Sequence, residues 1–392
     1  MQRLPGSIWA LGFVSLFMDI SSEMIHGLLP VFLVVGLGAS PLIVGLIEGI
    51  GEATANVTKL FSGVLADLTR RRKALAVIGY GLGALSKPVF ALAPSAGWVL
   101  AARFADRVGK GIRGAPRDAL VADLAPPGMV GAAFGLRQAI DNVGAFLGPL
   151  LAIALMWVLA DDFRTVFWLA AIPGALAVLV LVLAVREPPP AADRPPPPRL
   201  DRATLGRLPR LYWLTVGAGA ILTLARFTEA FVILRAEDLG LALALSPLIL
   251  VAVNLVSSAL TYPVGVLSDR IGRRGLLAGG FGALIAADLV LATAPGLTAV
   301  FAGAALWGLH LALSQGLLAA LVADTAPAGL RGTAFGAFNL VNGLALFLAS
   351  VIAGALWAAY GPAVTFWAGA GLATLGLGAF LIAGRAARRP AP

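Results

Sequence analysis

Runs of about twenty apolar residues, separated by short polar breaks, recur along the whole chain. A bilayer core about 30 Å thick is crossed by roughly 20 residues of helix, so each run predicts a membrane-spanning helix. A soluble protein needs polar residues to cover its core, and this chain is 59% hydrophobic and only 12% charged, against about 45–50% and 25% in soluble domains. This excludes an ordinary soluble enzyme and a disordered chain. We expect an all-α membrane protein with twelve spans, over residues 8–36, 41–67, 74–93, 97–121, 131–158, 165–185, 211–235, 246–268, 276–294, 298–322, 331–358 and 362–384.

Basic residues are concentrated in alternate breaks between the spans. They gather at 70–73, at 186–210 and at 270–274, whereas Arg164 is the only basic residue in the intervening breaks. Lys and Arg are retained on the cytoplasmic side during insertion, so we expect both termini in the cytoplasm, in a bacterial-type inner membrane. The net charge of +9 then reflects topology, and we expect the lipid bilayer, not nucleic acid, as the partner.

A linker rich in Pro and Arg, over residues 187–210, divides the chain into two halves of six spans. Such a linker is stiff and solvated. Gly63-Val-Leu-Ala-Asp67 recurs about 200 residues later as Gly265-Val-Leu-Ser-Asp269, and Leu120-Val-Ala-Asp123 recurs as Leu321-Val-Ala-Asp324. Because both halves begin on the same side of the membrane, we expect six-helix bundles at 1–186 and 211–392, related by a pseudo-two-fold axis along the membrane normal. Such repeats enclose a central cavity that opens alternately to each side.

The two repeated loops resemble the major facilitator superfamily, and this resemblance covers essentially the whole chain. The family loop reads G-x-L-A-D-R-x-G-R-[RK]; the second copy matches it well, and the first departs from it at Leu68 and Arg70. The resemblance implies a monomer whose loop aspartates and arginines act as a conformational gate. The gate residues would be Gly63, Asp67, Arg71, Arg72, Gly265, Asp269, Arg270 and Arg273.

A glycine pattern in the fifth span resembles the antiporter motif of the drug:proton exchangers in this superfamily. Gly135, Gly144 and Gly148-Pro149 match it, whereas Ala152 and Ile153 replace its final glycines. The resemblance implies close helix packing, a bend at the proline and export of the substrate. The alternative is generic packing of small residues.

Charged residues lie inside several spans, where they are costly. In span one, Asp19, Glu23 and His26 are spaced by four and then three residues, which places them on one helix face. A carboxyl group that alternates between a buried and an ionised state can couple transport to protons. The candidates are Asp19, Glu23, Glu48, Glu52, Asp141 and Glu229, and the alternative is structural ion pairs such as Arg137 with Asp141 and Arg226 with Glu229.

Other polar residues in the spans are candidates to line a substrate cavity. Exporters of the superfamily place an arginine in span four, in a motif resembling R-x-x-Q-G-x-G, and Arg103 fits it better than Arg107 although the glutamine is missing. The full set of cavity candidates is His26, Lys59, Lys87, Arg103, Arg107, Lys110, Arg113, Arg117, Arg137, Asn142, Arg226, Asn254, His310, Gln315, Asn339 and Asn342.

These features together favour a secondary transporter that exports a small organic molecule in exchange for protons. The basic stripe of span four suggests an amphiphilic or anionic substrate. No H-E-x-x-H, G-x-S-x-G or phosphate-loop motif occurs, so we expect no enzyme activity and no cofactor, with the proton gradient as energy source. The alternatives are transport of a divalent metal bound by Asp19, Glu23 and His26, transport of a metal chelate, and a polar-metabolite facilitator. A receptor without a transport cycle is a further reading, but it would not need two copies of the gate loop.

Overall fold

A computed structural model describes residues 4–69, 71–126, 129–187, 205–327 and 330–386 of the chain. Within these ranges every regular element is helical. Side chains are not described at 63–69, 269, 271, 331, 332 and 382–386. The chain divides into two compact units, and each is considered by itself. Unit 1 comprises Met1–Ala39, Ile50–Pro197 and Leu243–Leu248, and unit 2 comprises Ser40–Gly49, Pro198–Ala242 and Ile249–Pro392.

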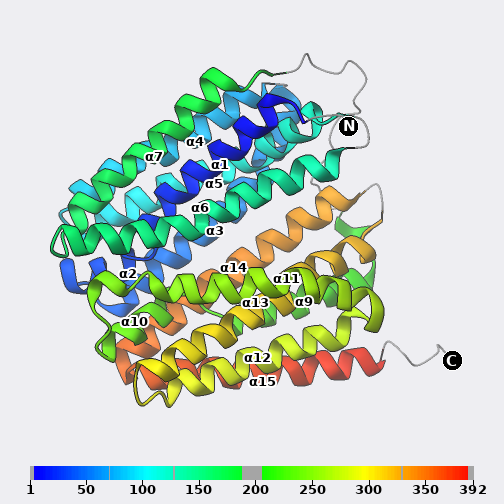
Figure 1. The fold of residues 1–392 in the computed structure, drawn as a ribbon. Helices are drawn as coiled ribbons and strands as arrows, with labels where there is room; N and C mark the ends of the chain where they lie inside the picture. The colour runs from blue at the N-terminus through cyan, green and yellow to red at the C-terminus, as the bar shows by residue number, and fades with distance from the viewer. Residues whose placement is uncertain (1–3, 70, 127–128, 188–204, 328–329, 387–392) are drawn as a thin grey trace. The chain divides into compact units, whose positions relative to one another are not determined.

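Unit 1 is built from long helices that pack in recurring pairs. Helix α1 packs against α6 and α7, and α4 packs against α5 and α7 (Figure 1). Buried apolar side chains such as Leu11, Tyr80 and Leu181 form the core between them. The helices are α1 (Gly6–His26), α2 (Leu29–Val31), α3 (Pro41–Thr69, whose first residues belong to unit 2), α4 (Arg72–Leu92), α5 (Ala96–Leu124), α6 (Val130–Val158) and α7 (Phe163–Ala184).

Unit 2 repeats the helix pairing of unit 1. Helix α9 packs against α14 and α15, and α12 packs against α13 and α15 (Figure 1). These helices lie about 200 residues after their counterparts in unit 1, so the sequence repeat is also a repeat of packing. The helices are α9 (Arg210–Ala225), α10 (Ala230–Asp238), α11 (Leu248–Ile271, whose first residue belongs to unit 1), α12 (Arg273–Ala292), α13 (Leu297–Thr325), α14 (Arg331–Tyr360) and α15 (Pro362–Ala386).

Ten helical segments among the described residues are long and apolar enough to cross a membrane. The remaining two predicted spans, 41–67 and 97–121, form α3 and α5, each 29 residues long. Both are long enough to cross, but α5 carries a stripe of charged residues that lowers its mean hydropathy. All twelve predicted spans are therefore long enough to cross, and length together with composition identifies ten of them among the described residues.

The first span is not one continuous helix, which corrects the prediction of a single helix over 8–36. Helix α1 ends at His26, and α2 and a π-helical turn, Phe32–Gly36, follow. Pro30 has no N–H to donate to the carbonyl of His26 four residues earlier, and in a continuous helix its ring would clash with that carbonyl. Gly27 lies where a Cβ would be 2.7 Å from Pro247, so the chain also needs a small residue at the break.

The predicted span 211–235 is broken in the same way. Helix α9 ends at Ala225 and α10 begins at Ala230. The hydroxyl of Thr228 accepts a hydrogen bond from the Ala230 N–H at 3.0 Å, which satisfies a donor at the start of a new helix. The first span of each repeat is therefore interrupted at an equivalent position.

Asp162 caps the first turn of α7 in the connection from α6. Its carboxylate accepts hydrogen bonds from the Arg164 and Thr165 N–H groups at 3.0 and 3.3 Å, and from the Thr165 hydroxyl at 2.5 Å. The hydrogen bonds from Thr165 hold the pKa of the Asp162 carboxyl below its usual value of 3.8, because they favour the charged form.

We expect Asp162→Ala to lower the free energy of unfolding by about 1 kcal/mol, as loss of an N-cap does. Since the pKa of Asp162 is lower in the folded state, its contribution is complete above the pKa of an unfolded aspartate and is lost as the pH falls below about 4. Thermal unfolding of both proteins at pH 7 and pH 3 measures this. An equal difference in unfolding temperature between wild type and variant at the two pH values would contradict this prediction.

Candidate functional site

A buried ion pair joins α4 and α5 inside unit 1. Lys87 Nζ donates to Asp106 Oδ1 at 2.8 Å, and the two side chains are only 1% and 6% exposed. Lys87 also donates to the Ser22 hydroxyl of α1 at 3.2 Å. The helices approach this closely because Gly79 and Gly109 face each other; a Cβ on either would lie within 2.7 Å of the carbonyl oxygen of the other. One lysine therefore ties three helices together.

A second ion pair connects α5 to α3. Arg107 Nη1 lies 3.2 Å from Glu52 Oε1, and the Glu52 side chain is 27% exposed. Gly51 makes room for this contact, since a Cβ there would lie 3.1 Å from Cγ of Arg103 and 3.3 Å from Cγ of Arg107. The Glu52 carboxylate is thus partly accessible, while its arginine partner is buried.

Two acidic residues from different helices meet where α1 packs on α6. The Asp19 carboxyl interacts directly with the Asp141 carboxyl, and Glu23 and Arg113 also act on Asp19. Arg137 Nη1 lies 3.4 Å from Asp141 Oδ2. Oδ1 of Asp141 is buried and accepts from no donor within the described residues. We refer to Asp19 and Asp141 as the carboxyl pair.

Glycines of the antiporter-like motif bring α6 against α1. A Cβ on Gly144 would lie 2.5 Å from the carbonyl oxygen of Leu16, and one on Gly148 would lie 2.7 Å from Cβ of Glu23. Pro149 follows within the same helix. At Gly135, by contrast, a Cβ would meet nothing within 4 Å. Two of the three glycines therefore hold the helix contact beside the carboxyl pair.

Other predicted residues of unit 1 do not belong to the carboxyl pair itself, although Glu23 and Arg113 act on Asp19. Glu23 Oε2 is 3.5 Å from His26 Nδ1, and both side chains are about one-fifth exposed. The Arg113 guanidinium lies 4.9 Å from the ring centroid of Tyr80, and Arg117 pairs with its neighbour Asp118. Lys59, Lys110 and Asn142 are exposed, and Lys110 interacts electrostatically with Glu52, Glu23 and Asp19.

The metal alternative has no ligand set in the described part of the chain. No three His, Asp or Glu side chains there are grouped closely enough to hold one ion, the trio Asp19, Glu23 and His26 included. Glu23 and His26 contact each other, whereas Asp19 lies one turn away beside Asp141. The three residues share a helix face but do not converge on a point.

The gate loops contain the same ion pair twice. Arg72 pairs with Asp123 in unit 1, and Arg273 pairs with Asp324 in unit 2. Arg71 and Arg270 are exposed, and a Cβ on Gly265 would meet nothing within 4 Å. Gly63, Asp67 and Asp269 have side-chain positions outside the described set, so their gate role stays a prediction.

The predicted polar residues of unit 2 are mostly dispersed. Arg226 and Glu229 lie half-buried at the break between α9 and α10, and no ion pair or hydrogen bond joins them within the described residues. The helix ends at Ala225, so their spacing of three no longer places them on one helix face. Buried Glu48, half-buried Asn254 and Asn339, and exposed Gln315 complete this set.

Two of the predicted polar residues of unit 2 have hydrogen-bond partners that account for their position. His310 is buried, and its Nδ1 lies 2.9 Å from the Gly280 carbonyl oxygen, so it links α13 to α12. Asn342 Oδ1 accepts from the Thr223 hydroxyl at 2.9 Å. These contacts are those of hydrogen-bonded core residues.

Two acidic residues were missed by the sequence analysis as site residues. Asp106 forms the buried pair with Lys87, and Asp288 in α12 is fully buried with no hydrogen-bond partner for either carboxyl oxygen among the described residues. Gly369 leaves space for it, because a Cβ there would lie 2.6 Å from Asp288 Oδ2. An acidic residue in an apolar run was the available signal, since such residues are functional candidates by default.

Comparisons with known proteins identify relatives over most of the chain. A family model described as Major Facilitator Superfamily matches residues 11–350 and 215–392. An uncharacterized MFS-type transporter of Methanocaldococcus jannaschii is 33% identical over 382 residues, which cover 95% of this chain and 94% of that protein. The multidrug resistance protein MdtH of Photorhabdus laumondii is 30% identical over 168 residues, covering 43% of this chain and 41% of MdtH. The crystal structure of a point mutant of the nucleoside transporter NupG matches with a TM-score of 0.81 at 14% identity, covering 96% of this chain and 99% of that one, which shows a shared fold.

Proposed function

Because this chain belongs to the Major Facilitator Superfamily, we propose that it is a secondary transporter that exports a small organic molecule in exchange for protons. It works by alternating access, as a monomer in the bacterial inner membrane with both termini in the cytoplasm. The proton gradient supplies the energy, and no cofactor takes part. The likeness to MdtH, which is named a multidrug resistance protein, supports export.

The observation that carries proton coupling is the carboxyl pair. Two carboxylates in contact cannot both be ionised without strong repulsion, so such a pair favours one shared proton. The unsatisfied Oδ1 of Asp141 is consistent with an oxygen that faces another carboxyl. Binding or loss of this proton changes the repulsion between α1 and α6, and so shifts the balance between two conformations of the transporter.

The basic residues of α5 support an anionic or amphiphilic substrate. Arg103, Arg107 and Arg113 are buried on this helix, and Glu52 compensates Arg107 from a partly exposed position. An anion that displaced Glu52 would find a preformed cationic site. Release of Glu52 would then make its carboxylate available for a proton, together with Glu23 and the carboxyl pair.

We expect Asp19→Asn and Asp141→Asn each to abolish the dependence of transport on an imposed pH gradient, with at least a tenfold loss of gradient-driven flux. Exchange of substrate across the membrane without a gradient should persist, because the variants remove the proton site and not the substrate site. The assay is flux in proteoliposomes of whichever compound is carried from a panel of radiolabelled organic anions and cations.

The control is Asp118→Asn on α5, whose carboxylate is 41% exposed and pairs, among the described residues, with its neighbour Arg117. This variant should keep wild-type gradient dependence. Gradient-independent flux in the wild type would identify a facilitator instead. Unchanged coupling in both variants would remove the carboxyl pair from the coupling mechanism.

A further inference from the structure

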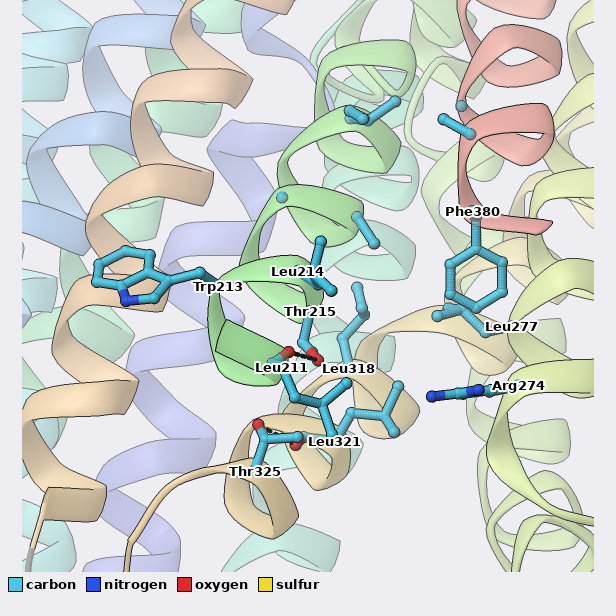
Figure 2. A pocket seen from close by; sticks show the side chains of 15 residues that line it. Leu211, Trp213, Leu214, Thr215, Arg274, Leu277, Leu318, Leu321, Thr325 and Phe380 are labelled. Carbon is cyan, nitrogen blue, oxygen red and sulfur yellow. Dashed lines mark hydrogen bonds between the residues drawn. The ribbon is translucent and has the colours of Figure 1, made fainter. Parts of the chain in front are cut away.

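Unit 2 contains an apolar pocket of about 270 Å³ between α9, α12, α13 and α15 (Figure 2). Its walls include Leu214, Leu277, Leu318 and Phe380. All four helices contribute residues near one end, where α9 and α12 begin and α13 ends. Arg207, Arg210, Arg270, Arg273 and Arg274 are at the same helix ends.

The threonines that line the pocket do not offer free polar groups to a ligand. The Thr215 hydroxyl donates to the Leu211 carbonyl at 3.0 Å, and the Thr325 hydroxyl donates to the Leu321 carbonyl at 2.7 Å (Figure 2). Each hydrogen bond lies within one helix. The pocket is therefore suited to a hydrocarbon chain along most of its length.

Arg274 is the charged residue of the lining (Figure 2). It is exposed, and within the described residues it forms no ion pair or hydrogen bond. Its neighbour Arg273 lies beside it in the sequence but pairs with Asp324. Among the described residues the two adjacent arginines thus differ: Arg273 pairs with Asp324 of α13, and the guanidinium of Arg274 is available at the pocket.

The equivalent cation of unit 1 is used differently. Arg72 and Arg273 are each the first residue of their helix and form the equivalent ion pair, so in the structure Lys73 corresponds to Arg274. Lys73 Nζ donates to the Val182 carbonyl of α7 at 2.8 Å, and its backbone N–H donates to Glu187 at 3.1 Å. Unit 1 therefore uses this cation to hold α7, the counterpart of α15. Unit 2 has an arginine at this position, next to a pocket, and no described residue makes such a contact with it.

We propose that this pocket binds one acidic phospholipid of the surrounding membrane, with an acyl chain between α9, α12, α13 and α15 and the phosphate on Arg274. Arginine binds phosphate through paired hydrogen bonds, and basic pockets between membrane helices on the cytoplasmic side bind acidic lipid headgroups. The choice of leaflet rests on the proposed membrane orientation; the binding site itself does not.

The experiment uses the full-length protein in nanodiscs of phosphatidylcholine and phosphatidylglycerol, with the same composition in both leaflets. Native mass spectrometry after release should find one retained phosphatidylglycerol per wild-type chain, and titration with this lipid should raise the unfolding temperature more than phosphatidylcholine does. Arg274→Ala should lower the affinity for phosphatidylglycerol about tenfold. Ala218→Phe, which fills the pocket from α9, should abolish retention of the lipid.

Arg207→Ala is the matched control, because Arg207 is exposed, belongs to the same arginine-rich region and does not line the pocket. It should keep wild-type lipid retention. Equal losses in Arg207→Ala and Arg274→Ala would overturn the proposal in favour of general surface charge. No retained lipid in the wild type, or equal retention of the two lipids, would also overturn it. Because no transport is measured, failure here leaves the proposed proton exchange intact.

Discussion

Replacing Asp106 by asparagine is expected to lower the free energy of unfolding by about 3–5 kcal/mol, the usual cost of breaking a buried ion pair from one side. Lys87 is 1% exposed, so its ammonium group would remain buried without a compensating charge. The carboxamide retains the shape of the carboxylate but not its charge. Unfolding followed in detergent by near-UV circular dichroism measures the change.

The double variant Lys87→Met, Asp106→Leu separates the charge effect from a loss of packing. Replacing both partners of a buried pair by apolar residues is often neutral or stabilising, so this variant should recover most of the loss. Lys87→Met alone should be destabilised, because the contacts it leaves to Asp106 are the long ones from the Ser86 hydroxyl at 3.5 Å and from Arg107 Nε at 3.9 Å. A double variant as unstable as Asp106→Asn would show that packing, not charge, dominates here.

The helices were predictable because membrane spans are set by local hydropathy and length. Both interruptions were missed, although each has a local cause. Pro30 breaks the hydrogen bond to His26, and the Thr228 hydroxyl starts a new helix at Ala230. An apolar run conceals such breaks, since flanking residues such as Phe227 and Phe231 are as apolar as those inside a helix. Pro30 was the clearer signal of the two.

The candidate site was predictable only within single helices. Spacing placed Asp19, Glu23 and His26 on one face, and also Arg137 with Asp141, which the structure pairs at 3.4 Å. It could not pair Lys87 with Asp106 or bring Asp19 to Asp141, because these contacts depend on the rotation of one helix against another. That rotation is determined by close contacts such as the one between Gly79 and Gly109. The spacing of residues within one helix does not reveal which residue of another helix each glycine meets.

The two glycines Gly144 and Gly135 of α6 should respond in opposite directions to the same substitution. A Cβ at Gly144 would lie 2.5 Å from the Leu16 carbonyl oxygen and 3.0 Å from the Leu16 Cα. Backbone atoms of α1 cannot rotate away as a side chain can, so the two helices must separate. We expect Gly144→Ala to lower the free energy of unfolding by about 3 kcal/mol, at the upper end of the cost of overpacking.

Gly135→Ala is the matched control, on the same helix and within the same motif. Nothing lies within 4 Å of a Cβ at this position, so alanine adds only its better helix propensity, worth up to about 1 kcal/mol. Thermal unfolding of the two variants beside wild type measures whether each substitution raises or lowers the stability. Equal destabilisation by both would mean that the motif does not act through contact with α1.

Separation of α1 from α6 in Gly144→Ala would also part Asp19 from Asp141. This variant should therefore lose gradient-driven flux even where enough folded protein remains, whereas Gly135→Ala should keep it.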